Sequence, residues 1–202
     1  MRRLWCWGLV LFLLLASEAC FALPRGIFHR ARVVDPGSIY GGGYVILLEH
    51  SAFALMGQAR MGVATDFEAG GRLVFTSYQN TNDLTIGGDA QYMFYGSTKE
   101  FPANISGVGG LDLTFGEDRT GFMITFGGLI DSRLKLKRGR NIYPYGGLLI
   151  IFSRWTSHGH SHGDTDLALC GGGIFRISEA VSIVSELRLT PDISIGVGLN
   201  FR

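Results

Sequence analysis

Hydrophobic and polar residues alternate with a period of two along most of the chain after residue 40. The pattern is strictest near the end, where Ile193 begins a series of five apolar residues that alternate with small or polar ones and ends at Phe201. Alternation of this kind places one class of side chain on each face of a β-strand. The segment Asp192–Phe201 also has the length of about ten residues that a tilted strand needs to cross a bilayer. It is therefore predicted to be a strand with one wholly apolar face.

Ten segments of this type are predicted, with short polar breaks between them. They cover residues 40–49, 53–63, 67–78, 84–95, 104–115, 121–134, 142–155, 166–177, 180–189 and 192–201. No helical pattern separates them, so we expect an antiparallel sheet with its strands in sequential order. The first segment is the least regular, because Tyr44–Leu48 is a continuous apolar run that also fits a plug or an extension of the second strand. Without it, and with one further merger, eight strands would remain; even counts are the rule in single-chain bacterial membrane barrels.

Two environments can receive the apolar face of such strands. A soluble sandwich buries it under a second sheet, whereas a membrane barrel turns it toward lipid and directs the small polar face into the lumen. No run of about 18 apolar residues follows residue 22, which excludes a membrane helix. We therefore predict an all-β fold for residues 40–202: a closed, antiparallel, up-and-down transmembrane barrel of eight to ten strands, with ten favoured. Leu148–Phe152 is apolar on both faces, which indicates a place where the lumen is packed rather than wet.

Charged residues on the predicted inner face are nearly balanced in sign. The set comprises Arg60, Glu68, Arg72, Asp89, Asp112, Asp131, Arg133, Asp166, Arg176, Glu186 and Arg188. A small barrel is only wide enough for side chains to fill, so these groups come within reach of one another. An unpaired buried charge costs several kcal/mol, on the order of the desolvation penalty of one ion. We therefore expect interlocking ion pairs and a closed lumen in preference to an open pore.

The first 22 residues are typical of a secretory signal. Arg2 and Arg3 form a positive start, Leu4–Ala16 is an apolar run, and small residues at Cys20 and Ala22 occupy the two cleavage positions. A lipoprotein signal with Cys20 acylated is the alternative, although the residues before Cys20 fit that motif poorly. Residues 23–39 have no sustained periodicity and are interpreted as an irregular N-terminal arm.

Removing residues 1–22 from the 202 leaves 180 residues with 16 basic and 16 acidic side chains. This balance argues against a nucleic-acid partner, which calls for a basic surplus on one face. Cys170 is then the one remaining cysteine, so no internal disulfide is expected, and a small residue on a strand is a better interpretation than a reactive thiol.

One segment has an unusual composition. His158, His160 and His162 are spaced two apart in a Gly- and Ser-rich stretch and could ligate a divalent transition metal, although a solvated loop is the favoured interpretation. Ser161 and Asp164 could complete a hydrolase set with His158 and His160, but groups that share one flexible loop lack the fixed geometry that nucleophilic catalysis needs. We therefore expect no catalytic residues, no enzymatic activity and no cofactor.

The chain resembles small bacterial outer-membrane β-barrel proteins, of the type represented by the membrane domain of outer membrane protein A and by the opacity proteins. The resemblance covers about residues 40–201 and depends on the export signal, the alternating strands, the short turns and the ending Asp192–Phe201. The segment Met56–Val63, followed by Asp66–Glu68, is similar to the strand-turn-strand units of those barrels. No motif identifies a subfamily.

The resemblance implies a bacterial outer-membrane location, contact with outer-membrane lipid, a monomer, and insertion by the assembly machinery. Gly196, Leu199 and Phe201 would be part of the signal that this machinery recognises. The implied role is structural or a surface interaction; a small pore or transporter, and a soluble periplasmic β-barrel binding protein, are the alternatives. Counting back from a periplasmic C-terminus places the break Thr156–Thr165 outside the cell and the break Gly96–Pro102 in the periplasm.

Overall fold

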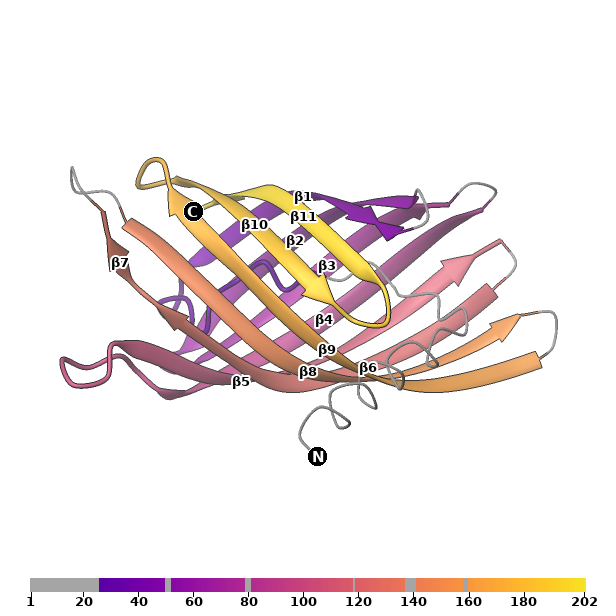
Figure 1. Cartoon of the computed structure of the whole chain (residues 1–202), viewed down its shortest axis with the longest axis horizontal. Coiled ribbons are helices and arrows are strands. Elements are labelled where there is room, and N and C mark those ends of the chain that lie inside the picture. Colours follow the sequence, from indigo (N-terminus) through magenta and orange to yellow (C-terminus); the bar gives the residue numbers. More distant parts are fainter. Residues whose placement is uncertain (1–25, 50–51, 79–80, 118, 137–140, 158–159) are drawn as a thin grey trace, which may run out of the picture.

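The chain closes into a single β-barrel, which Figure 1 shows from the side with its strands tilted across the long axis. The computed structural model describes residues 26–49, 52–78, 81–117, 119–136, 141–157 and 160–202. Over this part of the chain, no helix is long and apolar enough to cross a membrane.

Ten long strands make up the barrel over the described residues. They are β1 (Ile39–Leu48), β2 (Ala52–Ala64), β3 (Phe67–Ser77), β4 (Asn82–Tyr95), β5 (Ala103–Gly116), β6 (Arg119–Ser132), β8 (Asn141–Ser157), β9 (His160–Arg176), β10 (Val181–Leu189) and β11 (Ile193–Phe201). A two-residue strand, β7 (Leu134–Lys135), pairs with the start of β8. Sequential strands pair antiparallel, and pairing of β6 with β8 and of β1 with β11 completes the ring. The predicted closed, up-and-down barrel of ten strands is confirmed.

The first predicted strand is a full member of the wall. β1 pairs along its length with both β2 and β11, so the interpretation of Tyr44–Leu48 as a plug is wrong. The run is apolar on both faces because the lumen is apolar here too: Tyr44 and Ile46 are buried inside, while Val45 and Leu47 face outward.

The predicted break Thr156–Thr165 is also wrong, because β8 and β9 extend through it. Thr156 pairs with Ser161, and Ser157 pairs with His160. The backbone ladder needs no apolar side chains, so a hairpin continues beyond the point where the alternating apolar pattern stops. The histidine-rich segment therefore lies largely on strand rather than on a loop.

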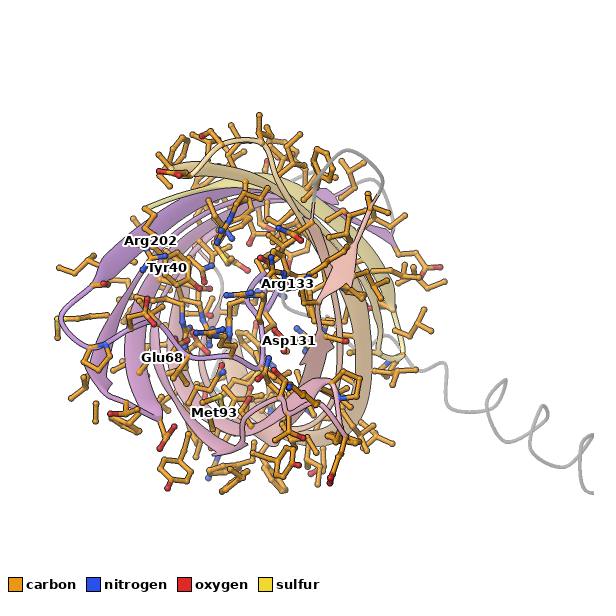
Figure 2. All side chains as sticks on the ribbon, turned by 90° about the vertical axis from the view of Figure 1, so that its left-hand side faces the viewer. Tyr40, Glu68, Met93, Asp131, Arg133 and Arg202 are labelled. Carbon is orange, nitrogen blue, oxygen red and sulfur yellow. The ribbon has the colours of Figure 1, made fainter. Side chains whose placement is uncertain are left out.

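Every long strand of the described chain presents large apolar side chains to the outside. In β11, Ile193, Ile195, Val197, Leu199 and Phe201 are each 40–51% exposed, while Gly196 between them is buried. Figure 2, a view into the end that carries Arg202, shows carbon-rich side chains around the rim and nitrogen and oxygen atoms gathered inside. An apolar surface that surrounds the whole barrel far exceeds the patches found on soluble monomers and suits a hydrocarbon environment.

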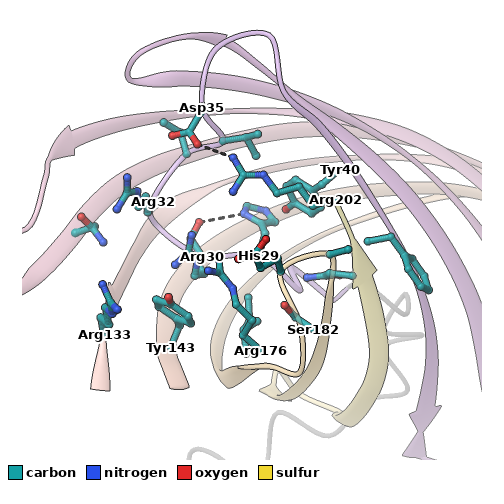
Figure 3. A pocket seen from close by; sticks show the side chains of 18 of the residues that line it. His29, Arg30, Arg32, Asp35, Tyr40, Arg133, Tyr143, Arg176, Ser182 and Arg202 are labelled. Atoms are coloured by element: carbon teal, nitrogen blue, oxygen red, sulfur yellow. Dashed lines mark hydrogen bonds and ion pairs between the residues drawn. The ribbon is translucent and has the colours of Figure 1, made fainter. Parts of the chain in front are cut away.

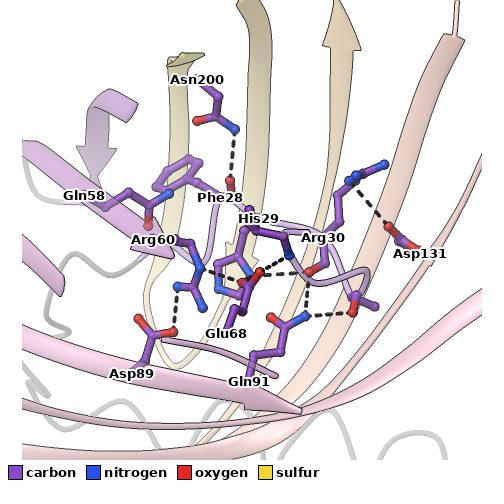
Figure 4. A network of polar contacts seen from close by, with 12 residues as sticks. Phe28, His29, Arg30, Gln58, Arg60, Glu68, Asp89, Gln91, Asp131 and Asn200 are labelled. Carbon is purple, nitrogen blue, oxygen red and sulfur yellow. Dashed lines mark hydrogen bonds and ion pairs between the residues drawn. The ribbon is translucent and has the colours of Figure 1, made fainter. Parts of the chain in front are cut away.

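The arm, residues 26–38, runs inside the barrel, a position that the sequence did not predict. Its side chains Ile27, Phe28, His29, Ala31 and Val33 are all buried. The close view of Figure 4 shows Phe28, His29 and Arg30 of the arm beside side chains of the barrel wall such as Arg60 and Gln91.

Glycine allows the arm to turn from the lumen into the wall. Gly37 has φ 76°, a left-handed conformation that costs glycine little. Gly37 N donates to Gly62 O at 2.8 Å, and Gly62 N donates to Ser38 O at 3.1 Å. A Cβ at Gly62 would lie 2.4 Å from the carbonyl oxygens of Val34 and Asp35, so this glycine lets the arm lie directly against β2.

Candidate functional site

Two arginines and three carboxylates form a continuous ion-pair network on the inner face of β2 to β5, here called the charged wall. Arg60 Nε lies 2.7 Å from Glu68 Oε1, and Arg60 Nη1 lies 2.6 Å from Asp89 Oδ2. Arg72 donates to both carboxylate oxygens of Asp112, at 2.7 and 2.8 Å, and Arg72 Nη1 donates to Asp89 Oδ1 at 3.3 Å. Asp89 therefore joins the two arginines into one network of buried charge, part of which is drawn in Figure 4.

Glycines on the neighbouring strands make room for these charges. Gly70 is the ladder partner of both Arg60 and Asp89, and Gly87 is the ladder partner of both Arg72 and Asp112. A Cβ at Gly87 would lie 1.5 Å from Asp112 Oδ1. The bidentate pair between Arg72 and Asp112 fits only because this position carries no side chain.

The opposite side of the lumen, formed by β6, β8 and β9, is apolar and is called here the apolar wall. It consists of Met123, Leu129, Leu149, Ile151, Ala168 and Cys170. Ile27 and Ala31 of the arm belong to the same buried cluster. The expectation that Leu148–Phe152 marks a packed part of the lumen is met here, because Leu149 and Ile151 are buried inside.

The arm is held by side chains of the wall that bind its backbone. Glu186 accepts hydrogen bonds from Ile27 N and Phe28 N, both at 2.9 Å, and from the Tyr145 hydroxyl at 2.7 Å. Gln91 Nε2 donates to the carbonyl oxygens of Arg30 and Ala31 at 2.9 and 2.7 Å. Buried backbone groups that no strand pairs are thus satisfied by the barrel.

Phe28 anchors the deep part of the arm. Its ring stacks on Tyr44 at a centroid distance of 4.4 Å. A Cβ at Gly196 would lie 2.2 Å from the Phe28 ring, so the small residue in β11 provides the space that this ring occupies. Phe28 itself has φ 49°, an uncommon conformation for a bulky residue. The surrounding contacts therefore hold the backbone in a strained turn.

His29 faces the charged wall and is buried. Its Nδ1 lies 3.3 Å from the Arg30 carbonyl oxygen, to which the Nδ1–H tautomer donates, and 3.9 Å from Glu68 Oε1. Burial, followed by the nearby Arg60 charge, lowers the pKa of His29 to about 3. The imidazole is therefore neutral at physiological pH.

The other predicted lumen charges lie in different surroundings. Asp131, Glu186 and Arg188 are buried and Asp166 is half-buried, whereas Arg133 and Arg176 are exposed at the barrel end. The sequence predicted all of them on the inner wall. Arg133 and Arg176, however, lie at strand ends, where side chains reach the opening of the barrel rather than its lumen.

One ion pair was missed because its residues were assigned to polar breaks. Arg119 Nε donates to Asp83 Oδ2 at 2.9 Å, at the end of the barrel opposite the C-terminus. The guanidinium also lies 4.8 Å from the Tyr78 ring centroid and 5.4 Å from that of Trp155. Burial raises the pKa of the Tyr78 hydroxyl. A signal was available, since aromatic residues flank both charges in the sequence.

Two of the three candidate metal ligands fall within the described residues. His160 and His162 are exposed on β9, and His158 lies outside the described part. No group of three His, Cys, Asp or Glu side chains in the described chain could hold a metal ion. Strand alternation also places Ser161 on the opposite face from His160 and Asp164, which separates the groups of the hydrolase hypothesis.

A cavity of about 420 Å³ opens at the barrel end that carries the C-terminus, and it is called here the mouth pocket. The arm forms one side, and the ends of the strands form the other (Figure 3). Five arginines line it: Arg30, Arg32, Arg133, Arg176 and Arg202. A much smaller cavity of about 30 Å³ lies deeper in the lumen, between the charged and apolar walls.

No family model and no curated protein matches this sequence. The solved structures to which it is similar include bacterial outer-membrane β-barrels. The KdgM porin has a TM-score of 0.44 and 10% identity, covering 81% of this chain and 98% of that one. The β domain of the Bordetella autotransporter Brka has a TM-score of 0.46 and 12% identity, covering 83% and 99%. The N-terminal barrel of Pseudomonas aeruginosa OprF has a TM-score of 0.38 and 10% identity, covering 82% and 97%.

Proposed function

We propose that the protein is a non-enzymatic, integral barrel of the bacterial outer membrane, with its lumen closed by the arm and by the charged wall. Its role is structural or a surface interaction. The observation that carries the proposal is the combination of an apolar exterior on every long strand with a lumen occupied by residues 26–38. In this proposal the protein is a monomer in outer-membrane lipid, and the assembly machinery recognises a signal that includes Gly196, Leu199 and Phe201.

A closed lumen is supported by the contents of the barrel interior. The cavity between the two walls has a volume of about 30 Å³, which is room for about two water molecules. His29, Arg72 and Leu149 all line it, so arm, charged wall and apolar wall meet around this space. A hydrated solute would have to displace the arm in order to pass.

Fractionation followed by gel electrophoresis and bilayer recording tests this proposal. The protein should partition with the outer membrane, migrate differently before and after boiling, and produce no stepwise conductance. Folding and solubility without any detergent would contradict the membrane assignment. Regular conductance steps from the unmodified protein would contradict the closed lumen.

A gated pore is the second candidate, favoured by the way the arm is attached. Over much of its length the arm is held by side chains such as Glu186 and Gln91 rather than by strand ladders. Gly196→Val would place atoms where the Phe28 ring lies and displace the arm, whereas a Cβ at Gly57, on the outer face, meets nothing within 4 Å. Conductance in the Gly196→Val protein, with none in Gly57→Val, would support gating. Closed barrels in both variants would contradict it.

A further inference from the structure

The mouth pocket combines an excess of positive charge with an enclosed, partly apolar space. Its five arginines face two carboxylates, those of Asp35 and Glu179. We propose that this pocket binds a small soluble anion that carries at least two carboxylate or phosphate groups. The proposal goes beyond the closed barrel described above and does not depend on it.

Carboxylates near the pocket form ion pairs with two of its five arginines, Arg202 and Arg30. Asp35 is used by Arg202, whose Nη2 donates to Asp35 Oδ2 at 2.7 Å. Arg30 Nε lies 3.8 Å from Asp131 Oδ2, which is too long for a hydrogen bond. Asp131 instead accepts a hydrogen bond from the Asn104 side chain. Asp131 therefore attracts Arg30 as an ion-pair partner without a hydrogen bond, and a bound anion could accept hydrogen bonds from this guanidinium.

Among the five arginines, Arg30 should contribute most to binding such a ligand, because the arm places its guanidinium group inside the barrel. Burial lowers the pKa of Arg30, which means that its guanidinium has lost part of its hydration while remaining charged at neutral pH. It lies 4.4 Å from the Tyr143 ring centroid, and Arg176 approaches the same ring at 5.7 Å. Both guanidinium groups thus lie against the Tyr143 ring and border the same pocket, where a ligand with two acidic groups could reach each of them.

The size and lining of the pocket limit the ligand to a compact molecule. A volume of about 420 Å³ is near the lower end of small-molecule sites, which run from roughly 300 to 1,000 Å³. Tyr40 and Ile174 add apolar surface to the guanidinium groups. This lining suits a short carbon skeleton with acidic groups at its ends, such as a di- or tricarboxylate.

The ligand would join the arm to the barrel. Arg30 and Arg32 lie on the arm, whereas Arg133 and Arg176 lie at the ends of the strand wall, as Figure 3 shows. An anion held by both pairs would connect two segments that otherwise meet through side-chain contacts. Binding should therefore raise the temperature at which the barrel unfolds.

Isothermal titration calorimetry on the folded full chain in an uncharged maltoside detergent, at low salt, tests the proposal. Citrate and pyrophosphate serve as probes, and glycerol is the uncharged comparison. We expect saturable binding of at least one anion, none of glycerol, and an affinity that falls as salt is added. Comparing the two anions distinguishes carboxylate from phosphate as the preferred group. Absence of saturable heat with both anions would overturn the proposal.

Variants locate the binding. The double variant Arg133→Gln/Arg176→Gln changes exposed side chains, so the barrel should still form, and the affinity should fall by at least about tenfold. Arg154→Gln, which changes an exposed arginine near the opposite end of β8, is the matched control and should bind within about twofold of the unmodified protein. Equal losses in both variants, or unchanged binding in the double variant, would refute the site. Boiled and unboiled gel samples verify that each variant is folded.

Discussion

The charged wall and the apolar wall enclose the same arm but hold it by different physics. On the charged wall, the side chains of Arg60 and Glu68 are each 1% exposed and form an ion pair. They stabilise the fold only while each keeps its partner, because an unpaired buried charge is destabilising. On the apolar wall, Leu149 and Ile151 contribute by packing, which has no directional requirement. Glu68 of the charged wall accepts a hydrogen bond from Val34 N of the arm, so this wall fixes the position of an arm backbone group, whereas the apolar wall supplies non-directional cohesion.

The largest effect should come from breaking the charged wall at its centre. Arg60→Leu leaves Glu68 and Asp89 buried without one of their cations, and the free energy of unfolding should fall by about 3–5 kcal/mol. Urea titrations followed by the gel shift or by Trp155 fluorescence measure it. Arg60→Met/Glu68→Met removes both signs and should recover part of the loss. A single variant no less stable than the double variant would show that the wall is not held by charge pairing.

A smaller loss is expected on the apolar wall. Leu149→Ala leaves a cavity where Leu149 packs in the cluster that holds Ile27 and Ala31, and should lower the free energy of unfolding by about 2–4 kcal/mol. The matched control is Leu148→Ala on the outer face, where Leu148 is 51% exposed and lipid can fill the space. The same urea titration should give a loss below about 1 kcal/mol for the control. Equal losses would mean that the lumen is not packed as described.

The two walls also differ in how far the sequence predicted them. Alternation identified the ten strands and the inward side of residues such as Arg60 and Asp112, because a strand has only two faces. It could not identify the partners, since pairs such as Arg72 with Asp112 depend on the register of three neighbouring strands. Alternation showed that Leu148–Phe152 was apolar on both sides but not what packed against it.

The arm was the part least accessible to sequence reasoning. Residues 26–38 show no period of two or of 3.6, because an irregular segment meets different surroundings at each residue. Indirect signals existed: Ile27 and Phe28 are apolar within a basic segment, and Gly196 faces inward with no side chain to fill the lumen. Small inward residues of β11 were expected to form a polar lining of the lumen. Gly196 instead leaves the space that the Phe28 ring occupies.

The two walls should also respond differently to pH, because a neutral histidine faces the charged wall and none of the residues of the apolar wall is a histidine. The pKa of His29 is about 3 in the folded chain against an ordinary value of 6.5. At a pH between these two pKa values, the unfolded chain binds a proton that the folded chain does not. The free energy of unfolding is therefore highest above pH 6.5 and falls as the pH is lowered. Between pH 6.5 and pH 5, the free energy of unfolding should fall by about 2 kcal/mol.

His29→Gln isolates this effect from the carboxylates around it. The carboxylates of the charged wall are present in both proteins, so the difference between the two pH profiles belongs to the imidazole. Urea titrations at pH 7, 6 and 5 should show a steeper loss for the unmodified protein than for the variant. Parallel profiles would indicate that His29 becomes protonated in the folded barrel and that its surroundings are more polar than the structure describes.

The smallest effect should come from the contact that ties the arm to β8 and β10. Tyr145→Phe removes the hydroxyl that donates to Glu186 but leaves the two backbone donors, Ile27 N and Phe28 N, in place. One lost hydrogen bond to a charged acceptor that keeps its other partners should lower the free energy of unfolding by about 1–2 kcal/mol. Glu186→Gln, by contrast, removes the charge and replaces an acceptor oxygen with a donor, so its loss should exceed that of Tyr145→Phe in the same urea titration. If Tyr145→Phe were the more damaging of the two, the arm would be held by aromatic packing at this point and not by the carboxylate.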